Sequence, residues 1–190
     1  MRIIAGTLRS RTLEAPGGLA TRPTSDRLRE TLFNVLAPRI RDAAFLDLYA
    51  GSGAVGLEAL SRGAARVSFV ERAPAALKAL RANLEKLGVR TGFALDTGGV
   101  GPFLRKARGG PFDVVFLDPP WDAADEYAAT LGLLGGAGGG LLAEGALVIA
   151  EHRRKEKLAD RYGALQRTRL LEQGDAALSF YAAGESGDPE

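Results

Sequence analysis

The chain of 190 residues contains no cysteine, a single histidine and a single tryptophan. Without cysteine it can form no disulfide, thiol nucleophile or thiolate-bound metal or iron–sulfur cluster. The lone histidine, His152, excludes a zinc site built from several imidazoles. No apolar run approaches the roughly 20 residues that span a bilayer, and the N-terminus lacks the apolar core of a signal peptide. These absences predict a soluble, cytoplasmic protein with no membrane segment and no metal.

Charge is present in ordinary amount but is unevenly distributed. Residues 1–41 hold eight arginines and three acids, a net charge of 8 − 3 = +5, so the remainder of the chain carries +2 − 5 = −3. A basic segment on an acidic body indicates a polyanionic partner held at one end, although a solvated basic surface gives the same pattern. We therefore divide the chain into a basic extension (1–41), a main domain (42–183) and a polar tail (184–190).

The most informative stretch runs from Phe45 to Glu71. It reads, in order, as an apolar strand (44–49), a glycine turn (51–53), a short helix, a second apolar strand (67–70) and an acid (Glu71). This is a βαβ unit with a loop suited to a nucleotide-like ligand, because glycine allows a sharp turn and a close approach. Glu71 would lie at the end of the second strand, where a carboxylate can bind a ribose diol.

The same stretch also fits the dinucleotide pattern GxGxxG, formed by Gly51, Gly53 and Gly56 with an acid about 20 residues further on. By itself this loop cannot separate a nicotinamide enzyme from a methyltransferase.

The rest of the chain alternates helical and strand patterns. We expect an N-terminal hairpin (2–13), helices (24 or 25–36, 75–87, 103–107, 123–134 and a charged 155–162), strands (91–95, 112–117, 146–150) and a terminal hairpin (165–171 and 176–181). Alternation of this kind predicts an α/β fold with a mostly parallel sheet and a C-terminal antiparallel hairpin. Four acids fall in or at the ends of strands, on the edge where such sheets bind ligands: Asp47, Glu71, Asp96 and Asp118.

The tetrapeptide Asp118-Pro119-Pro120-Trp121 follows a buried strand. Two prolines stiffen the turn and remove two backbone donors, which leaves carbonyl oxygens without local partners. A carboxylate, a presented carbonyl and a large ring suit a planar base with an exocyclic amine, since the ring stacks on the base and the oxygens accept the amine hydrogens.

At this point the chain resembles a class I S-adenosylmethionine-dependent methyltransferase of the group that methylates amines, whose motif is (D/N/S)PP(Y/F/W). More closely it resembles the RsmD family, which methylates the exocyclic N2 amine of a guanine in 16S ribosomal RNA. The resemblance covers Arg2 to Tyr181 and is carried by these segments: RIIAG, RPTSDRLRETLFNVL, LDLYAGSGAVGLEALSRGA and FLDPPW. A tryptophan stands at Trp121, where tyrosine or phenylalanine is usual.

The resemblance implies a Rossmann-like methyltransferase sheet with S-adenosylmethionine as cofactor. It implies that the cofactor is contacted by these residues: Asp47, Tyr49, Gly51, Ser52, Gly53, Glu71, Arg72 and Asp96. Of these, Glu71 would bind the ribose hydroxyls and Asp96 would lie near the adenine amine. It implies catalytic contacts with the guanine from Asp118, Pro119, Pro120 and Trp121. Phosphates of the RNA would be held by Arg9, Arg11, Arg22 and Arg27. The expected partner is 16S rRNA within a small-subunit assembly particle, and the expected state is a monomer without a metal.

Three alternatives stay open at this stage. An adenine-N6 DNA methyltransferase shares the tetrapeptide. A nicotinamide-dependent oxidoreductase explains the glycine loop but leaves Asp118-Pro119-Pro120-Trp121 and the basic segment without a role. A non-enzymatic RNA-binding module explains only the basic segment.

Overall fold

The computed structural model describes residues 1–16, 25–106, 108–120, 123–136 and 140–183. Within these residues one sheet of eight strands has the order β3-β2-β1-β4-β5-β8-β7-β6. The strands are β1 (Ala44–Leu48), β2 (Arg66–Val70), β3 (Phe93–Asp96), β4 (Phe112–Leu117), β5 (Leu142–Arg153), β6 (Arg161–Tyr162), β7 (Leu165–Gln173) and β8 (Ala176–Ala183). The helices are α1 (Asp26–Leu36), α2 (Ala54–Ser61), α3 (Pro74–Leu87), α4 (Val100–Lys106) and α5 (Ala124–Leu134).

The sheet is parallel from β3 to β5 and antiparallel beyond it. β1 pairs in parallel with β2 and β4, and the parallel ladder continues to β3 and β5 on either side. The pairs β5–β8, β8–β7 and β7–β6 are antiparallel. The predicted fold class is confirmed.

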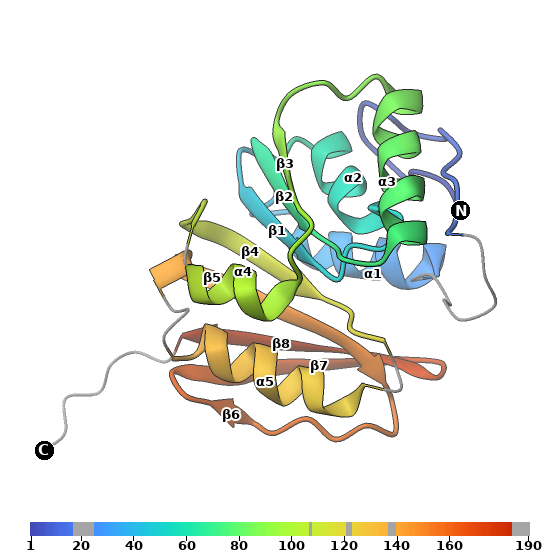
Figure 1. Cartoon of the computed structure of the whole chain (residues 1–190). Coiled ribbons are helices and arrows are strands. Elements are labelled where there is room, and N and C mark those ends of the chain that lie inside the picture. Colours follow the sequence, from blue (N-terminus) through green and yellow to red (C-terminus); the bar gives the residue numbers. More distant parts are fainter. Residues whose placement is uncertain (17–24, 107, 121–122, 137–139, 184–190) are drawn as a thin grey trace, which may run out of the picture.

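Helices cover both faces of the sheet (Figure 1). One buried cluster joins α1, α2 and α3 to one side of the strands, through side chains such as Leu32, Leu57 and Leu80. A second cluster joins α4 and α5 to the other side, through side chains such as Leu104 and Leu131. The alternation of the central strands therefore divides their side chains between two apolar layers.

Helix ends follow the sequence signals. The Ser25 hydroxyl accepts a hydrogen bond from the Leu28 amide at 3.1 Å and caps α1. Pro74 lies in the first turn of α3, where its missing N–H costs nothing, and Gly88 ends that helix in the left-handed conformation. The predicted helix from 24 or 25 to 36 and the predicted helix from 75 to 87 are confirmed.

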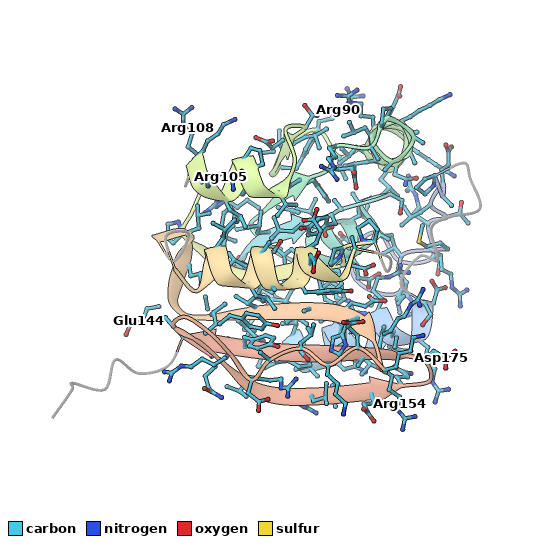
Figure 2. The ribbon with its side chains drawn as sticks, turned by 60° about the horizontal axis from the view of Figure 1, so that its bottom comes forward. Arg90, Arg105, Arg108, Glu144, Arg154 and Asp175 are labelled. Atoms are coloured by element: carbon cyan, nitrogen blue, oxygen red, sulfur yellow. The ribbon has the colours of Figure 1, made fainter. Side chains whose placement is uncertain are left out.

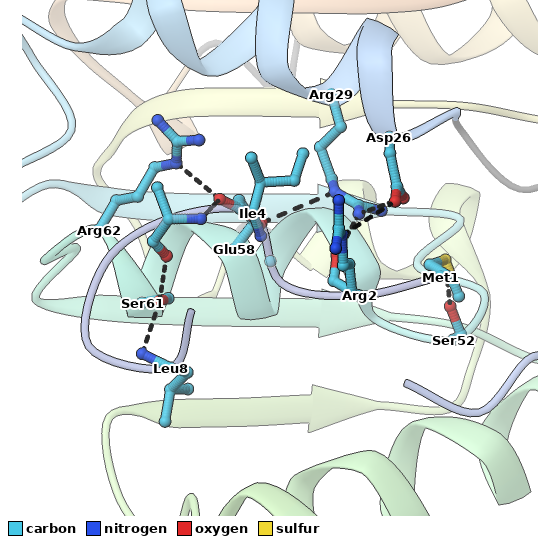
Figure 3. A network of polar contacts seen from close by, with 12 residues as sticks. Met1, Arg2, Ile4, Leu8, Asp26, Arg29, Ser52, Glu58, Ser61 and Arg62 are labelled. Atoms are coloured by element: carbon cyan, nitrogen blue, oxygen red, sulfur yellow. Dashed lines mark hydrogen bonds and ion pairs between the residues drawn. The ribbon is translucent and has the colours of Figure 1, made fainter. Parts of the chain in front are cut away.

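The first 13 residues form a hairpin-shaped loop with a single antiparallel bridge, Arg2 to Thr12, in place of the two expected strands. Three amides bond across the hairpin, Ile3 N to Arg11 O, Ser10 N to Ile3 O and Leu13 N to Met1 O, at 2.9 to 3.0 Å. The amides between them bond to α2: Ile4 N and Ala5 N donate to the two carboxylate oxygens of Glu58 at 2.7 and 3.0 Å (Figure 3). Sequence spacing could not reveal this, because the partner lies more than 50 residues away.

The same carboxylate pairs with two guanidinium groups. Glu58 and Arg29 are fully buried, with Arg29 Nε 3.7 Å from the carboxylate, and Arg62 Nε lies 2.7 Å from it (Figure 3). Arg29 also bonds to Asp26 at 2.9 Å. Burial lowers the pKa of Arg29, while the two acids oppose that shift. This pairing fixes the N-terminal loop, α1 and α2 as one unit.

The predicted charged helix over 155–162 is wrong. The segment is a turn followed by the short strand β6. Its backbone is bound to distant groups, since Arg154 N donates to Asp175 O at 2.8 Å and the Tyr181 hydroxyl donates to Ala159 O at 2.9 Å. These long-range contacts outweigh the helical propensity of a lysine- and glutamate-rich run.

The division of the chain at residue 41 stays a prediction. The apolar face of α1 lies in the same buried cluster as β1 and β8, and the predicted tail, 184–190, lies outside the described residues. Among the described helices none has the length and apolarity needed to cross a bilayer.

Candidate active site

The strand register brings carboxylates from neighbouring strands to one edge of the sheet. Leu48 pairs with Val70 and with Leu117, and Leu117 pairs with Ala150, so the residues that follow lie at the same level. Strand neighbours thus place Asp96, Glu71, Asp47 and Asp118 along the edge where open α/β sheets bind ligands. This edge lies toward the right in Figure 1, where β4 and β5 end.

The glycine loop between β1 and α2 has the backbone that the sequence predicts. Gly51 and Gly53 have φ angles of 57° and 78°. A Cβ at Gly51 would meet no atom nearer than the Tyr49 carbonyl oxygen at 4.0 Å, whereas one at Gly53 would lie 2.2 Å from Leu80 Cδ1. Gly56 packs against the Phe69 ring in the same way. Gly51 therefore borders open space, and the other two glycines permit close packing of the loop and α2.

Asp47 lies beneath this loop. Its side chain is 2% exposed, and its Oδ2 accepts a hydrogen bond from Gly56 N at 2.9 Å. Burial raises the pKa of Asp47 to about 8; the Gly56 hydrogen bond opposes the shift and the charge of Glu71 adds to it. The carboxyl group thus fixes the start of α2 and adds to the acidity of the edge.

Glu71 and Asp96 shape the neighbouring loops. Glu71 Oε2 accepts from Gly51 N at 2.8 Å, and its Oε1 accepts from Arg72 N and Ala73 N at 2.7 and 2.8 Å. Asp96 Oδ1 accepts from Gly98 N at 2.8 Å. Glu71 Oε1 thus uses both of its lone pairs, whereas Glu71 Oε2 and Asp96 Oδ1 each accept one of these bonds, so both groups keep acceptor capacity toward a ligand.

The Asp118-Pro119-Pro120 corner directly follows β4. Pro119 is buried and Pro120 is exposed. The Pro120 carbonyl accepts a hydrogen bond from Ala123 N at 2.9 Å, so the expectation that the carbonyls lack local partners fails at this residue. Trp121 lies outside the described residues, and its predicted stacking role stays a prediction.

Asp118 belongs to an acidic group that includes a residue the sequence reading missed. Burial raises the pKa of Asp118 well above its usual range, and the charges of Glu151 and Asp47 raise it further. Glu151 is 3% exposed and directly follows Ala150 in β5. The other acids were singled out because they lie in or at the end of a predicted strand. Glu151 meets the same criterion, because it directly follows the predicted strand 146–150.

Tyr49 and Ser52, two of the predicted cofactor residues, have side chains that contact other parts of the fold. The Tyr49 hydroxyl bonds to Glu126 Oε2 and Thr130 Oγ1 of α5, each at 2.7 Å, and burial raises the pKa of Tyr49. The Ser52 hydroxyl lies 3.9 Å from Met1 Sδ (Figure 3), and its carbonyl accepts from Asn83 Nδ2 at 2.9 Å. Tyr49 is thereby directed to α5 and Ser52 to the N-terminal loop.

Asn83 is a buried residue that no motif in the sequence indicated. Its Nδ2 also donates to Glu14 O at 3.0 Å, and its Oδ1 accepts from Glu14 N at 2.7 Å. Since the same amide holds Ser52, the N-terminal segment and the glycine loop share one anchor. Arg72 is exposed at the start of the loop before α3.

The predicted RNA-binding arginines do not gather at the site. Arg11 donates to Lys86 O at 3.1 Å, in the last turn of α3, and Arg9 follows the segment bonded to Ser61 at the end of α2. Both helices begin at the ligand edge and run away from it. Arg27 is exposed in the first turn of α1. Arg22 lies outside the described residues.

The residues present fit an adenosyl and methionine ligand. The open space beside Gly51 is a cradle that a Cβ would fill, and the carboxylates of Glu71 and Asp96 provide acceptors for hydroxyl and amine groups. The described side chains contain no group of three or more histidines and acids that could hold a metal ion.

Comparison with known proteins gives a consistent result. The family described as conserved hypothetical protein 95 matches residues 1–182. The chain is 42% identical over 151 residues to the ribosomal RNA small subunit methyltransferase D of Escherichia coli (strain K12), covering 80% of this chain and 74% of that protein. It is 34% identical over 183 residues to the "Putative rRNA methyltransferase YlbH" of Bacillus subtilis (strain 168), covering 95% and 98%.

Solved structures agree with this. The structure titled "Putative methyltransferase yhhF from Escherichia coli" superimposes with a TM-score of 0.83 at 39% identity, covering 96% of this chain and 97% of that one. A Haemophilus influenzae methylase, HI0767, gives a TM-score of 0.77 at 33% identity over 97% and 98% of the chains.

The sheet order, the glycine loop and the acids at the strand ends define a class I methyltransferase. The chain belongs to the conserved hypothetical protein 95 family, which is the RsmD family. The resemblance seen in the sequence is thus confirmed.

Proposed function

We propose that the protein transfers a methyl group from S-adenosylmethionine to the exocyclic N2 amine of a guanine in 16S rRNA, within a small-subunit assembly particle. The enzyme would act as a cytoplasmic monomer. The observation that carries the proposal is the position of the Asp118-Pro119-Pro120 corner beside the glycine loop, on the same sheet edge. The name of the Escherichia coli relative, ribosomal RNA small subunit methyltransferase D, supports the substrate class.

The chain's own residues would hold the cofactor and the base. Gly51 and Gly53 would admit the methionine part, with Glu71 on the ribose hydroxyls and Asp96 near the adenine amine. When bound, S-adenosylmethionine supplies an electrophilic methyl group on a positively charged sulfur. Burial raises the pKa values of Asp47 and Asp118, so a cationic donor bound beside them would favour their ionised forms and would be stabilised by them in turn.

Asp118 would orient the acceptor nitrogen. The lone pair of a guanine amine is conjugated into the ring, so the amine is a weak nucleophile that gains from being held in line with the methyl group. The Asp118 carboxylate and the Pro119 carbonyl would accept its two hydrogens. The nitrogen loses one proton as the N–C bond forms, and the raised pKa of Asp118 suits its carboxylate oxygen to receive that proton.

The target base must leave its stack to reach such a corner. The stacking partner would be Trp121. An adenine-N6 DNA methyltransferase would use the same corner, but membership of the RsmD family favours ribosomal RNA. A nicotinamide enzyme is not supported, because the family and the solved relatives are methyltransferases.

The proposal is tested by transfer of labelled methyl from S-adenosylmethionine to 16S rRNA, both naked and in small-subunit particles lacking the modification. Digestion of the product to nucleosides and mass spectrometry should yield N2-methylguanosine. Recovery of N6-methyladenosine, or no label in RNA while DNA is labelled, would contradict the proposed substrate.

Replacing Asp118 by Ala should lower methyl transfer by at least about 100-fold, because acceptor and proton-transfer roles are each worth roughly that much. Affinity for S-adenosylhomocysteine, measured by calorimetry, should change little. Asp125→Ala is the matched control, since this exposed acid lies in the first turn of α5 and should leave transfer unchanged. Near-normal turnover by Asp118→Ala would remove Asp118 from the mechanism.

A further inference from the structure

The turn that follows β5 carries the densest positive charge next to the catalytic corner. Residues 153–157 read Arg-Arg-Lys-Glu-Lys, four cations against one acid, a net charge of 4 − 1 = +3. This segment lies within the main domain (42–183), whose net charge is 17 − 17 = 0, and it is the segment where the expected helix is absent. The cations are therefore not spread around a helix but are gathered in one turn.

The register places this turn at the ligand edge. Leu117 of β4 pairs with Ala150 of β5, so Asp118 lies level with Glu151; β5 ends two residues later at Arg153, and the turn follows it. Figure 1 shows the chain leaving β5 at the same side of the sheet as the end of β4. Lys155 and Lys157 thus follow Glu151 by four and six residues and lie beyond the same edge of the sheet as the corner that would receive the base.

The turn is anchored and is not a loose loop. Arg154 N donates to Asp175 O at 2.8 Å, Glu156 N donates to Arg153 O at 2.9 Å, and Leu158 is buried in the core beside α5. Arg154 also pairs with Glu172 at 3.2 Å, with side chains 61% and 44% exposed, so part of its charge is already compensated. Figure 2 shows Arg154 and Asp175 at the same end of the molecule.

Lys155 and Lys157 are exposed, and neither forms an ion pair with the described residues. They lie on the α5 side of the sheet, because Leu158 next to them joins the cluster of α4 and α5. Arg27 is exposed on the opposite side, on α1. Arg9 and Arg11 lie at the far ends of α2 and α3 and cannot supply positive charge here.

We infer that the turn of residues 153–157 is a phosphate-binding surface for the RNA substrate, with Lys155 and Lys157 as its contacts. This inference rests on the proposed function and deepens it. RNA that enters the corner would be held on the α5 side by the two lysines and on the α1 side by Arg27. Lysine ammonium groups bind phosphates without reading sequence, so the turn sets position rather than base identity.

The test is the double variant Lys155→Gln/Lys157→Gln, measured for binding to 16S rRNA as a function of salt. Loss of two phosphate contacts should reduce the slope of log K against log salt by about 1.4–1.8, which corresponds to about 25- to 60-fold weaker binding at about 0.1 M salt. Affinity for S-adenosylhomocysteine and the thermal midpoint should match the unmodified protein. Lys155→Arg/Lys157→Arg keeps the charge and should restore binding.

The matched control is Arg105→Gln/Lys106→Gln, which removes the same charge from the end of α4. These two residues are exposed, and Figure 2 places Arg105 at the end of the molecule opposite Arg154. The inference would be overturned if both double variants lost the same RNA affinity, or if Lys155→Gln/Lys157→Gln left the salt slope unchanged. Either result would leave the proposed function standing. An unmodified protein that binds no 16S rRNA would overturn the proposed function as well.

Discussion

Asp47 is a carboxyl group buried beneath the glycine loop between β1 and α2. Its folded pKa of about 8 lies far above its ordinary value of 3.8, so the folded state binds more protons than the unfolded state between these two values. The unfolding free energy of the cofactor-free protein should therefore fall as pH rises from about 4 to about 8.

The Asp47→Asn variant should lack this part of the pH dependence. Chemical denaturation at pH 5 and pH 8 measures it: the unmodified protein should lose more stability across this interval than the variant does. Asp125→Asn, at an exposed site, should behave like the unmodified protein. Identical pH profiles for unmodified protein and Asp47→Asn would show that this carboxyl group titrates normally in the fold.

Gly51 and Gly53 allow a matched comparison. Both adopt left-handed backbone, so alanine at either position should cost about 1–2 kcal/mol. At Gly53 the added methyl overlaps the buried side chain of Leu80, which should cost a further 1–3 kcal/mol. At Gly51 the methyl enters open space, so the additional loss should appear in S-adenosylhomocysteine affinity and not in stability.

Denaturation and calorimetry on the two variants distinguish these effects. A Gly51→Ala protein that binds S-adenosylhomocysteine normally would show that the ligand does not occupy the space beside this glycine.

At the scale of single residues, the sequence predicted those roles that depend on the residue's own backbone or on its immediate neighbours along the chain. The glycines, the prolines and the acids after strands could be predicted because backbone geometry and strand ends are encoded locally. Asn83 could not, because its partners Glu14 and Ser52 are 69 and 31 residues away. Tyr49 was expected at the cofactor, but the side chains that bind its hydroxyl come from α5.

Among the elements, α2 depends most on a single side chain. Glu58→Ala would leave the buried Arg29 with Asp26 as its remaining carboxylate partner and would leave the Ile4 and Ala5 amides without their Glu58 acceptors. Removing one partner of a buried pair typically costs about 3–5 kcal/mol. Urea denaturation should show a loss of this size, whereas Glu30→Ala on the exposed face of α1 should change stability by less than about 0.5 kcal/mol.

Elements with strong periodicity or clear end signals were predicted well, including α1, α3 and β4. The N-terminal strands and the helix over 155–162 were predicted less well, because distant residues bind part of each segment. In the first case the hairpin keeps one bridge and three cross-bonds, while the Ile4 and Ala5 amides bind Glu58. In the second, Asp175 and Tyr181 hold the backbone in a turn.

For the molecule as a whole, the shared core predicts cooperative unfolding. α1 contributes Leu28, Leu32, Phe33 and Leu36 to the cluster that contains β1 and β8. Residues 1–41 should therefore not unfold separately, and scanning calorimetry should show one transition with equal calorimetric and van't Hoff enthalpies. Two separated transitions would instead support an independently folding extension.

Strand β8 is the last of the eight along the chain, yet it lies inside the sheet between β5 and β7. During synthesis on a ribosome, β5 would emerge long before the strand that covers its free edge. The half-made protein thus exposes unpaired backbone next to Glu151 until translation reaches Ala176–Ala183. We therefore expect the active fold to form only once the C-terminal hairpin has been made, and a nascent chain stalled before that point should be inactive and prone to aggregate.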